Sequence, residues 1–309
     1  MKEKKGLTAP LDCLGMGIIP LDLLYTVDHF PRPGGKVNAV DLCLQGGGPV
    51  PNALVGLSRL GMSTALIAVL GNDWVGRFGM EELQKEKVDC RFIITKKALS
   101  ATAAGFIEQG SGRRTIAFHR KVGLKPVDIR TSRYPIPRVI HLDGRDLEAS
   151  MKLARWGKRM GALISFDIGS IRNDVSPIFS LVDHLVVADA YALPFTGARS
   201  AKQAIIRLTS QCSGNIVVTQ GTKGSIGLEN GEFTCHPAFK IDVIDTTGAG
   251  DAFHVGYLFA LLKGYDMNDR LRFGAAVAAL KCTRAGGRVG MPTLRQLNRF
   301  LKSDPETYA

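Results

Sequence analysis

Buried strands and helices alternate along this chain of 309 residues, and this alternation is the feature that most restricts its fold. Strands are expected near 12–19 and at 64–70, 138–143, 162–168, 184–189 and 215–220. Helices are expected at 52–60, 72–87 (with Asn72 as its cap), 147–160, 201–211, 250–263 and 268–284. Such alternation indicates a parallel sheet covered by helices on both faces. The expected fold class is α/β, with a doubly wound, mostly parallel sheet.

Two stretches interrupt the alternation. Residues 22–44 and 101–120 look strand-like, and the second stretch has a turn at 109–112 that predicts an antiparallel hairpin. Together they predict a small β-sheet lid. A further hairpin is expected at 225–235, turning at Asn230-Gly231. No long linker or fixed-period repeat appears, so residues 1–309 are expected to form a single domain with this lid.

Composition excludes several classes of function. The net charge is +12, but the 40 basic residues are spread out and no basic segment is interleaved with aromatic residues, which argues against nucleic-acid binding. Pro10 and Asp12 interrupt the only candidate signal peptide, and no membrane span is expected. Six cysteines lie far apart without a Cys-x-x-Cys pair, so we expect reduced thiols and a cytoplasmic protein.

The run from Asp245 to Asp251 carries the strongest chemical signal. Its glycines precede the apolar helix expected at 250–263, where unpaired N–H groups and the helix dipole favour a phosphoryl group. A carboxylate in such a place suits the acceptance of a proton from an attacking alcohol, which would make Asp251 a general base. The alternative is that Asp251 only caps the helix.

A second glycine cluster precedes the helix expected at 52–60. Gly46, Gly47 and Gly48 allow close approach of a ligand to the backbone, and Asn52 offers both a donor and an acceptor. Such a site suits a polyhydroxylated substrate. The alternative is an ordinary turn.

The two clusters, in this order, closely resemble the two signatures of the PfkB (ribokinase-like) family of carbohydrate kinases. The resemblance covers nearly the whole chain. It implies transfer of the γ-phosphoryl group of ATP, with Mg²⁺, to a primary hydroxyl of a sugar. It also implies that Asp251 is the base and that the amides of Gly248, Ala249 and Gly250 stabilise the transferred group.

The resemblance assigns the binding residues as well. Those implied to hold the sugar are Asp22, Gly47, Gly48 and Asn52. Those implied to border the nucleotide are Thr219, Gly221 and Gly224, with Cys282 and Gly286 in a segment that covers adenine. Asp245 and Thr247 are implied to hold a monovalent cation such as K⁺. For Asp22 the alternative is a solvent-facing or capping aspartate, and for the adenine segment it is a plain loop.

One departure concerns the metal. The family commonly carries Asn-x-x-Glu where this chain has Ala188-Asp189-Ala190-Tyr191, so both expected side chains are missing. Asp189 or bound water would then substitute, or the metal dependence would differ.

The acceptor is suggested by one arginine. The segment from Ile140 to Arg145 resembles ketohexokinases and sulfofructose kinases, in which Arg145 would pair with an anionic or polyol group; a surface ion pair is the alternative. We therefore expect a ketose or an anionic ketose derivative as substrate. Two other functions stay open: a nucleoside kinase with Phe106 and Phe118 as the clamp, or an inactive sugar-binding regulator. Exposed lid edges suggest a homodimer.

Overall fold

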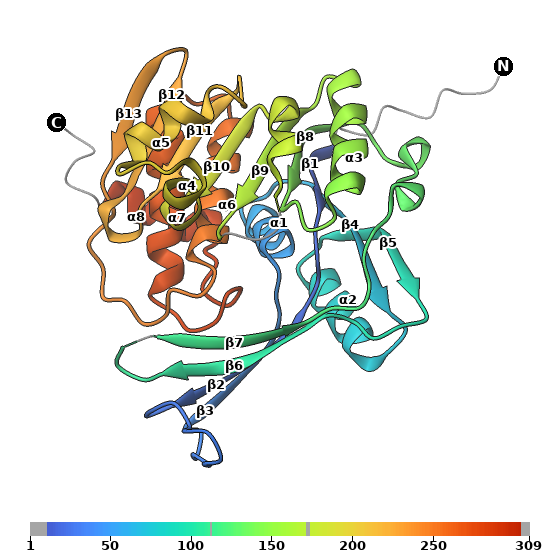
Figure 1. Ribbon diagram of the computed structural model, residues 1–309, viewed down its shortest axis with the longest axis vertical. Coiled ribbons are helices and arrows are strands. Elements are labelled where there is room, and N and C mark those ends of the chain that lie inside the picture. The colour runs from blue at the N-terminus through green and yellow to red at the C-terminus, as the bar shows by residue number, and fades with distance from the viewer. Residues whose placement is uncertain (1–10, 112, 171–173, 304–309) are drawn as a thin grey trace.

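The computed structural model describes residues 11–111, 113–170 and 174–303, and its main element is a nine-stranded sheet (Figure 1). The strand order is β13-β12-β11-β10-β9-β8-β1-β4-β5. The strands are β1 (Leu11–Met16), β4 (Thr64–Gly71), β5 (Asp89–Lys96), β8 (Pro137–Leu142), β9 (Leu163–Ile168), β10 (His184–Ala188), β11 (Asn215–Thr219), β12 (Ser225–Glu229) and β13 (Glu232–His236). All pairs are parallel except the hairpin β12–β13 and its pairing with β11. The expected fold class is confirmed.

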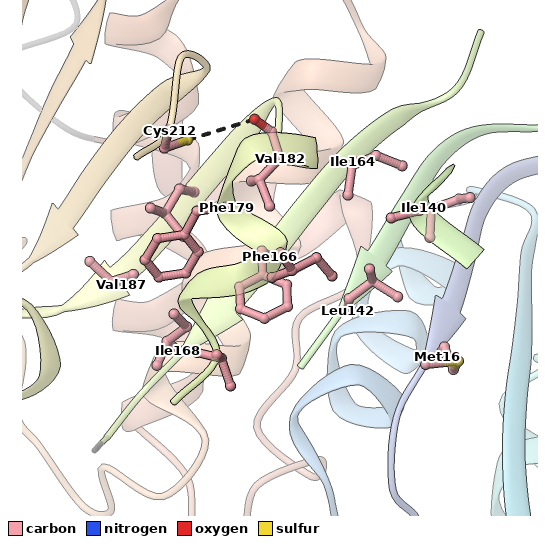
Figure 2. Close-up of a cluster of buried hydrophobic side chains, with 14 of the residues drawn as sticks. Met16, Ile140, Leu142, Ile164, Phe166, Ile168, Phe179, Val182, Val187 and Cys212 are labelled. Carbon is pink, nitrogen blue, oxygen red and sulfur yellow. Dashed lines mark hydrogen bonds between the residues drawn. The ribbon is translucent and has the colours of Figure 1, made fainter. Parts of the chain in front are cut away.

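Helices cover both faces of this sheet. They are α1 (Pro49–Arg59), α2 (Trp74–Lys85), α3 (Leu147–Arg159), α4 (Asp189–Thr196), α5 (Ala201–Leu208), α6 (Ala249–Leu262), α7 (Met267–Cys282) and α8 (Leu294–Lys302). One core joins the sheet to α3, α5 and the 3₁₀ segment Ser176–Leu181, and Figure 2 shows Phe166 and Phe179 at its centre. The other core joins the sheet to α1, α6, α7 and α8. Alternate residues of each strand enter opposite cores, which is why the central strands are apolar throughout.

Local signals explain most of the helix ends. The cap of α2 is Asp73, whose side chain accepts the Gly76 N–H at 2.8 Å, so the expectation of Asn72 is wrong by one residue. The turn between β12 and β13 places Asn230 and Gly231 at positive φ, as the Asn-Gly pair predicts. Gly256 lets α6 approach α7, because a Cβ there would lie 2.0 Å from the Phe273 carbonyl oxygen.

A four-stranded sheet of order β3-β2-β6-β7 lies beside the carboxyl ends of the central strands (Figure 1). Its strands, β2 (Leu21–Val27), β3 (Asp41–Gly46), β6 (Thr102–Glu108) and β7 (Arg114–His119), come from the two stretches that the sequence sets apart. Asp22 pairs with Gln45 and Ala103, and Ala103 pairs with Phe118, so these side chains share the inner face. Tyr25, Leu42 and Phe106 share the opposite, outer face.

Parallel strands place their carboxyl ends at one edge, and in open α/β sheets ligands bind outside that edge. Here the β2–β3–β6–β7 sheet faces the same edge, and α6 starts beside it. Within the described ranges, no helix combines the length and apolarity needed to cross a bilayer.

Candidate active site

The N-terminus of α6 forms the centre of the site. Gly248 caps the helix with φ 74°, a left-handed conformation that favours glycine, and a Cβ there would lie 3.0 Å from Gly287 Cα. The Ala249 N–H donates to the Thr246 carbonyl at 3.1 Å. For the N–H groups of Gly248 and Gly250, no backbone or side-chain acceptor lies among the described residues. Two of the three predicted amides are therefore open to an incoming anion.

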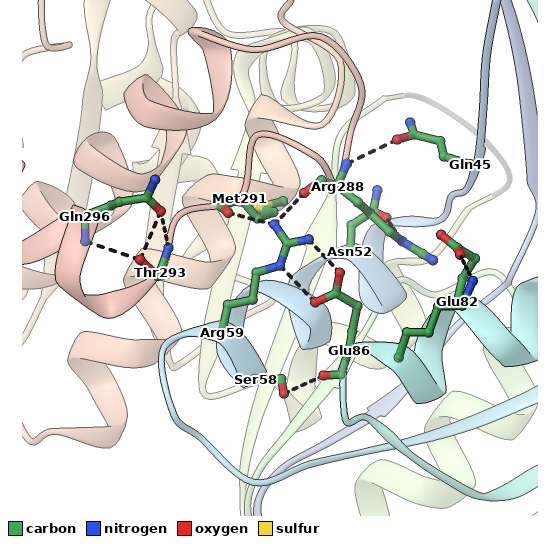
Figure 3. A network of polar contacts seen from close by, with 11 residues as sticks. Gln45, Asn52, Ser58, Arg59, Glu82, Glu86, Arg288, Met291, Thr293 and Gln296 are labelled. Atoms are coloured by element: carbon green, nitrogen blue, oxygen red, sulfur yellow. Dashed lines mark hydrogen bonds and ion pairs between the residues drawn. The ribbon is translucent and has the colours of Figure 1, made fainter.

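Asp251 lies in the first turn of α6 and is held by a chain of side chains. Asn52 Nδ2 of α1 donates to Asp251 Oδ2 at 2.6 Å, and Asn52 Oδ1 accepts from Arg288 Nε at 2.8 Å. Figure 3 shows Asn52 and Arg288 meeting between α1 and the chain that follows α7. The direction of the predicted base is thus fixed by contacts between residues that are 199 and 236 positions apart in the sequence. Arg288 was missed as a site residue, and its only signal was its place beside Gly286 and Gly287.

The Arg288 side chain is buried, with 4% of its surface exposed. Its Nη2 donates to the Gly47 carbonyl at 2.9 Å, and its own carbonyl accepts from Arg59, which also binds Glu86 (Figure 3). Burial lowers the pKa of the guanidinium to about 10, and the charge of Asp22 opposes this shift. Arg288 therefore remains a cation that joins both glycine clusters.

Asp22 of β2 lies against the first glycine cluster. A Cβ on Gly47 would lie 2.3 Å from Asp22 Oδ2, so only glycine leaves room for this carboxylate. Gly48 has φ 98° and caps α1, and a Cβ there would strike the Ile18 carbonyl oxygen at 2.2 Å. Burial raises the pKa of Asp22 to about 7, the charge of Asp251 adds to the rise, and Arg288 opposes it.

The pKa of Asp251 is also raised, chiefly by burial and then by the charge of Asp167, whereas the hydrogen bond from Asn52 lowers it. Asp167 of β9 lies 3.1 Å from His254 Nε2, one turn further along α6. A raised pKa brings a carboxylate closer to the range in which it accepts a proton effectively.

Arg114 of the small sheet reaches this centre. Its Nη1 donates to Thr247 Oγ1 at 3.4 Å, and its charge lowers the pKa of both Asp22 and Asp251. Arg114 was missed as a site residue, because an exposed arginine on a hairpin has no distinctive local pattern. Its contact with Thr247 brings one cation to the turn that precedes α6.

Beside the same helix N-terminus lies a cleft with mostly apolar walls. It contains Gly250 and four of the five residues predicted to border the nucleotide, namely Thr219, Gly221, Gly224 and Cys282. The rest of its walls consists of Thr222, Thr246 and small or apolar side chains from 238–243, α6 and α7. The fifth residue, Gly286, does not line the cleft: its N–H donates to Asp245 Oδ2 at 2.8 Å, and it packs on Gln45.

A second, polar cavity of about 220 Å³ lies at the ends of β8 and β9 and contains Arg145. Its other polar side chains are Arg120, Asp143, Ser170 and Tyr191. The Arg145 guanidinium lies 5.1 Å from the centre of the Phe118 ring on the inner face of the small sheet. Tyr191 is 3% exposed, and its hydroxyl has no hydrogen-bond partner among the described residues. Buried hydroxyls usually have a partner, so Tyr191 is available to a ligand.

The residues for metals differ from the usual pattern. Asp189 opens α4 at the end of β10, while Tyr191 stands where the family commonly has glutamate. Mg²⁺ bound with substrate phosphates needs one or two carboxylates and keeps several waters, so Asp189 suits such an ion. Asp245 and Thr247, predicted to hold a monovalent cation, are joined by a hydrogen bond from the Thr247 N–H to Asp245 Oδ1 at 2.8 Å.

Known proteins resemble this chain along nearly its whole length. A ribokinase of Haemophilus influenzae is 25% identical over 93% of this chain and 97% of its own. A 5-dehydro-2-deoxygluconokinase of Geobacillus thermodenitrificans is 24% identical (95% and 94%), and a nucleoside kinase of Methanothermobacter thermautotrophicus is 26% identical (94% and 95%).

Solved structures share the fold. A ribokinase of Thermotoga maritima superposes with a TM-score of 0.84 at 24% identity, covering 95% of this chain and all of its own. A putative ribokinase of E. coli, solved with ATP and Mg²⁺, has a TM-score of 0.82 at 20% identity, covering 95% of this chain and all of its own.

The family model described as pfkB family carbohydrate kinase matches residues 12–294. This span includes both glycine clusters, Asp22, Asp251 and Arg288, and the matched relatives are named as kinases of sugars or nucleosides. The chain therefore belongs to the pfkB family of carbohydrate kinases and is a sugar or nucleoside kinase.

Proposed function

We propose that this kinase transfers the γ-phosphoryl group of ATP to a primary hydroxyl of a ketose, preferably one with an anionic substituent. The observation that carries the proposal is the arrangement of Asp251, which is oriented by Asn52 beside the open amides of Gly248 and Gly250. A base and an anion site at one helix N-terminus suit the transfer of a phosphoryl group to an alcohol.

Each group has a stated part in the reaction. Asp251 accepts the proton of the acceptor hydroxyl as that oxygen attacks phosphorus. The amides of Gly248 and Gly250, with Arg114 of the lid, stabilise the charge on the transferred group. Mg²⁺, when bound, neutralises charge on the ATP phosphates. Asp22 accepts hydrogen bonds from sugar hydroxyls, while Gly47 and Gly48 let the sugar approach the backbone and align its hydroxyl.

The polar cavity supports an anionic acceptor. A volume of about 220 Å³ is several times the ~30 Å³ that one water occupies, which leaves room for a small charged substituent. Arg145 lines this cavity and its guanidinium lies 5.1 Å from the centre of the Phe118 ring on the inner face of the small sheet, so we assign it to the ligand. Arginine suits carboxylate, phosphate or sulfonate groups, and the Tyr191 hydroxyl supplies a further donor.

A nucleoside acceptor is the second candidate, because a relative at 26% identity is named a nucleoside kinase. The aromatic clamp expected for a base is not assembled here. Phe118 lies on the inner face of the small sheet, but Phe106 lies on the outer face with its ring 6.2 Å from that of Tyr25. The geometry of the lid therefore favours a sugar. The inactive regulator is disfavoured, since Asp251 and its partners are in place.

A panel of acceptors tests the proposal. ATP consumption is measured with ketoses, their carboxylated, phosphorylated and sulfonated derivatives, and nucleosides. We expect turnover of an anionic ketose and at least about tenfold lower kcat/KM in Arg145→Met, the usual loss for a hydrogen bond to a charged group. Arg133→Met, which removes an exposed guanidinium, is the matched control. Turnover of nucleosides alone would overturn the sugar assignment.

We also propose a homodimer joined through the outer face of the lid. Tyr25, Leu42 and Leu44 expose 37–48% of their surface there, and a second lid sheet would cover them. The mass in solution tests this contact. None of the six cysteines forms a disulfide, which supports a reducing compartment such as the cytoplasm.

A further inference from the structure

Lys281 is completely buried in the last turn of α7, although lysine is almost never buried without a partner. Its Nζ donates to the backbone carbonyl oxygen of Asp245 at 2.6 Å and lies 3.8 Å from Asp245 Oδ2. The negative carboxylate offsets part of the free energy lost when the ammonium leaves water. Burial lowers the pKa of Lys281 and the charge of Asp245 opposes this shift, so the ammonium at the start of the Asp245–Asp251 segment depends on this carboxylate.

Asp245 joins this segment to the end of α7. Its Oδ1 accepts the Thr247 N–H and its Oδ2 accepts the Gly286 N–H, both at 2.8 Å. The N–H groups of Ile244 and Asp245 both donate to the Cys282 carbonyl, at 2.8 and 3.2 Å. Loss of the positive charge would leave a buried carboxylate without its cation at this junction. The turn that follows carries the amides of Gly248 and Gly250.

These residues do not fit a free monovalent cation. Asp245 and Thr247 were expected to hold one, but the Asp245 carbonyl already accepts from the Lys281 ammonium. A second positive ion placed beside that ammonium, away from bulk water, would be repelled by it. The Lys281 ammonium supplies the positive charge that a monovalent cation from solution was expected to supply.

We propose that the Lys281 ammonium replaces a bound monovalent cation and makes this kinase independent of K⁺. Lys281 is a positioning residue: it holds Asp245 so that the turn presents its amides to the phosphoryl group. The activity measurements that follow rest on the proposed function. The binding measurements rest only on the geometry around Asp245.

The first test compares salts with the unaltered enzyme. We expect kcat to change by less than about twofold when K⁺ replaces tetramethylammonium at constant ionic strength, because no cation site is present to fill. Several-fold activation by K⁺ would overturn the proposal.

The second test creates a site for a monovalent cation by removing the Lys281 ammonium. Lys281→Met removes the charge and keeps most of the apolar stem. In tetramethylammonium we expect kcat to fall about tenfold or more, as for loss of a hydrogen bond to a charged group, and K⁺ or NH₄⁺ to restore it saturably. Lys302→Met, which removes an exposed charge from the end of α8, should show neither effect. An unchanged kcat, or a loss that no small cation reverses, would contradict the proposal.

Two measurements need no acceptor sugar. K⁺ should raise the Tm and the ATP affinity of Lys281→Met and leave both unchanged in the unaltered protein. If the panel of sugars fails while these shifts appear, the assigned acceptor is wrong but the role of Lys281 stands. If Lys281→Met does not fold in any salt, Lys281→Gln is measured in the same way, and absence of both shifts in it counts against the proposal.

Discussion

The two ends of the active site are built from different kinds of side chain. At the proposed nucleotide end, small and apolar residues such as Val243 and Ala279 line an open cleft, so specificity there would come from shape and backbone. At the proposed acceptor end, Arg145, Asp143 and Tyr191 surround a polar cavity. A phosphate donor shared by a whole family needs few specific side chains, whereas the acceptor must be distinguished from many similar alcohols.

Asp251 lies between the two ends, and its removal should have the largest effect. Asp251→Asn keeps an oxygen for the hydrogen bond from Asn52 but cannot accept the proton, so we expect kcat to fall by about a hundredfold or more with little change in sugar affinity. Steady-state kinetics with a separate binding titration measures both quantities.

Asp28→Asn, on an exposed turn of the lid, is the control for loss of one carboxylate. Unchanged turnover in Asp251→Asn would remove Asp251 as the base and leave it as a helix cap. In that case another group would have to accept the proton of the acceptor hydroxyl.

Residues that a local pattern contains were easier to single out from the sequence than residues that act through distant contacts. Thr219, Gly221 and Gly224 belong to one contiguous segment, so a local pattern contains their spacing. Arg288 and Arg114 act through contacts with residues more than a hundred positions away, which no local pattern records. Their roles depend on how α1, α7 and the lid pack.

The fold shows the same difference between elements that have a clear local pattern and elements that lack one. The helix expected at 147–160 is found at Leu147–Arg159, because its apolar face repeats regularly over several turns. The edge strand β5 was missed, since its residues are half-exposed and Asp89, Arg91 and Lys96 break the apolar pattern. Helix α4 was missed because it is short and contains Pro194.

A pH effect should appear at the acceptor end. Burial raises the pKa of Asp22 to about 7, and only its ionised form accepts hydrogen bonds from two sugar hydroxyls. We expect kcat/KM for the sugar to rise with pH and level off above about 7, falling up to about tenfold per unit below it. Asp22→Asn should lower kcat/KM for the sugar and flatten its rise with pH. The pH dependence of the KM for ATP should not change.

The raised pKa of Asp22 also predicts that stability falls as pH rises, whereas kcat/KM is expected to rise. The pKa of Asp22 is higher in the folded chain than in the unfolded chain, so its contribution to stability is fully present below about 3.8 and is lost as pH rises through about 7. Above this range the buried carboxylate is charged. Asp22→Asn should therefore raise the Tm at pH 8 relative to the unaltered protein, and a lowered Tm at that pH would contradict the assigned shift.

The smallest effect should come from the wall of the nucleotide cleft. Val243 lines this cleft yet is 56% exposed, so its truncation costs the folded protein little. Bound ATP would cover the side chain, and Val243→Ala should then raise the KM for ATP by about two- to fivefold, as expected for two buried methyl groups partly in contact. The kcat and the KM for sugar should stay constant, because neither depends on contact with this wall. Val127→Ala, at a residue 76% exposed and outside the cleft, should change none of these values. If Val243→Ala altered sugar affinity as strongly as ATP affinity, the two ends would be coupled, and the division between a shape-based donor end and a charge-based acceptor end would have to be given up.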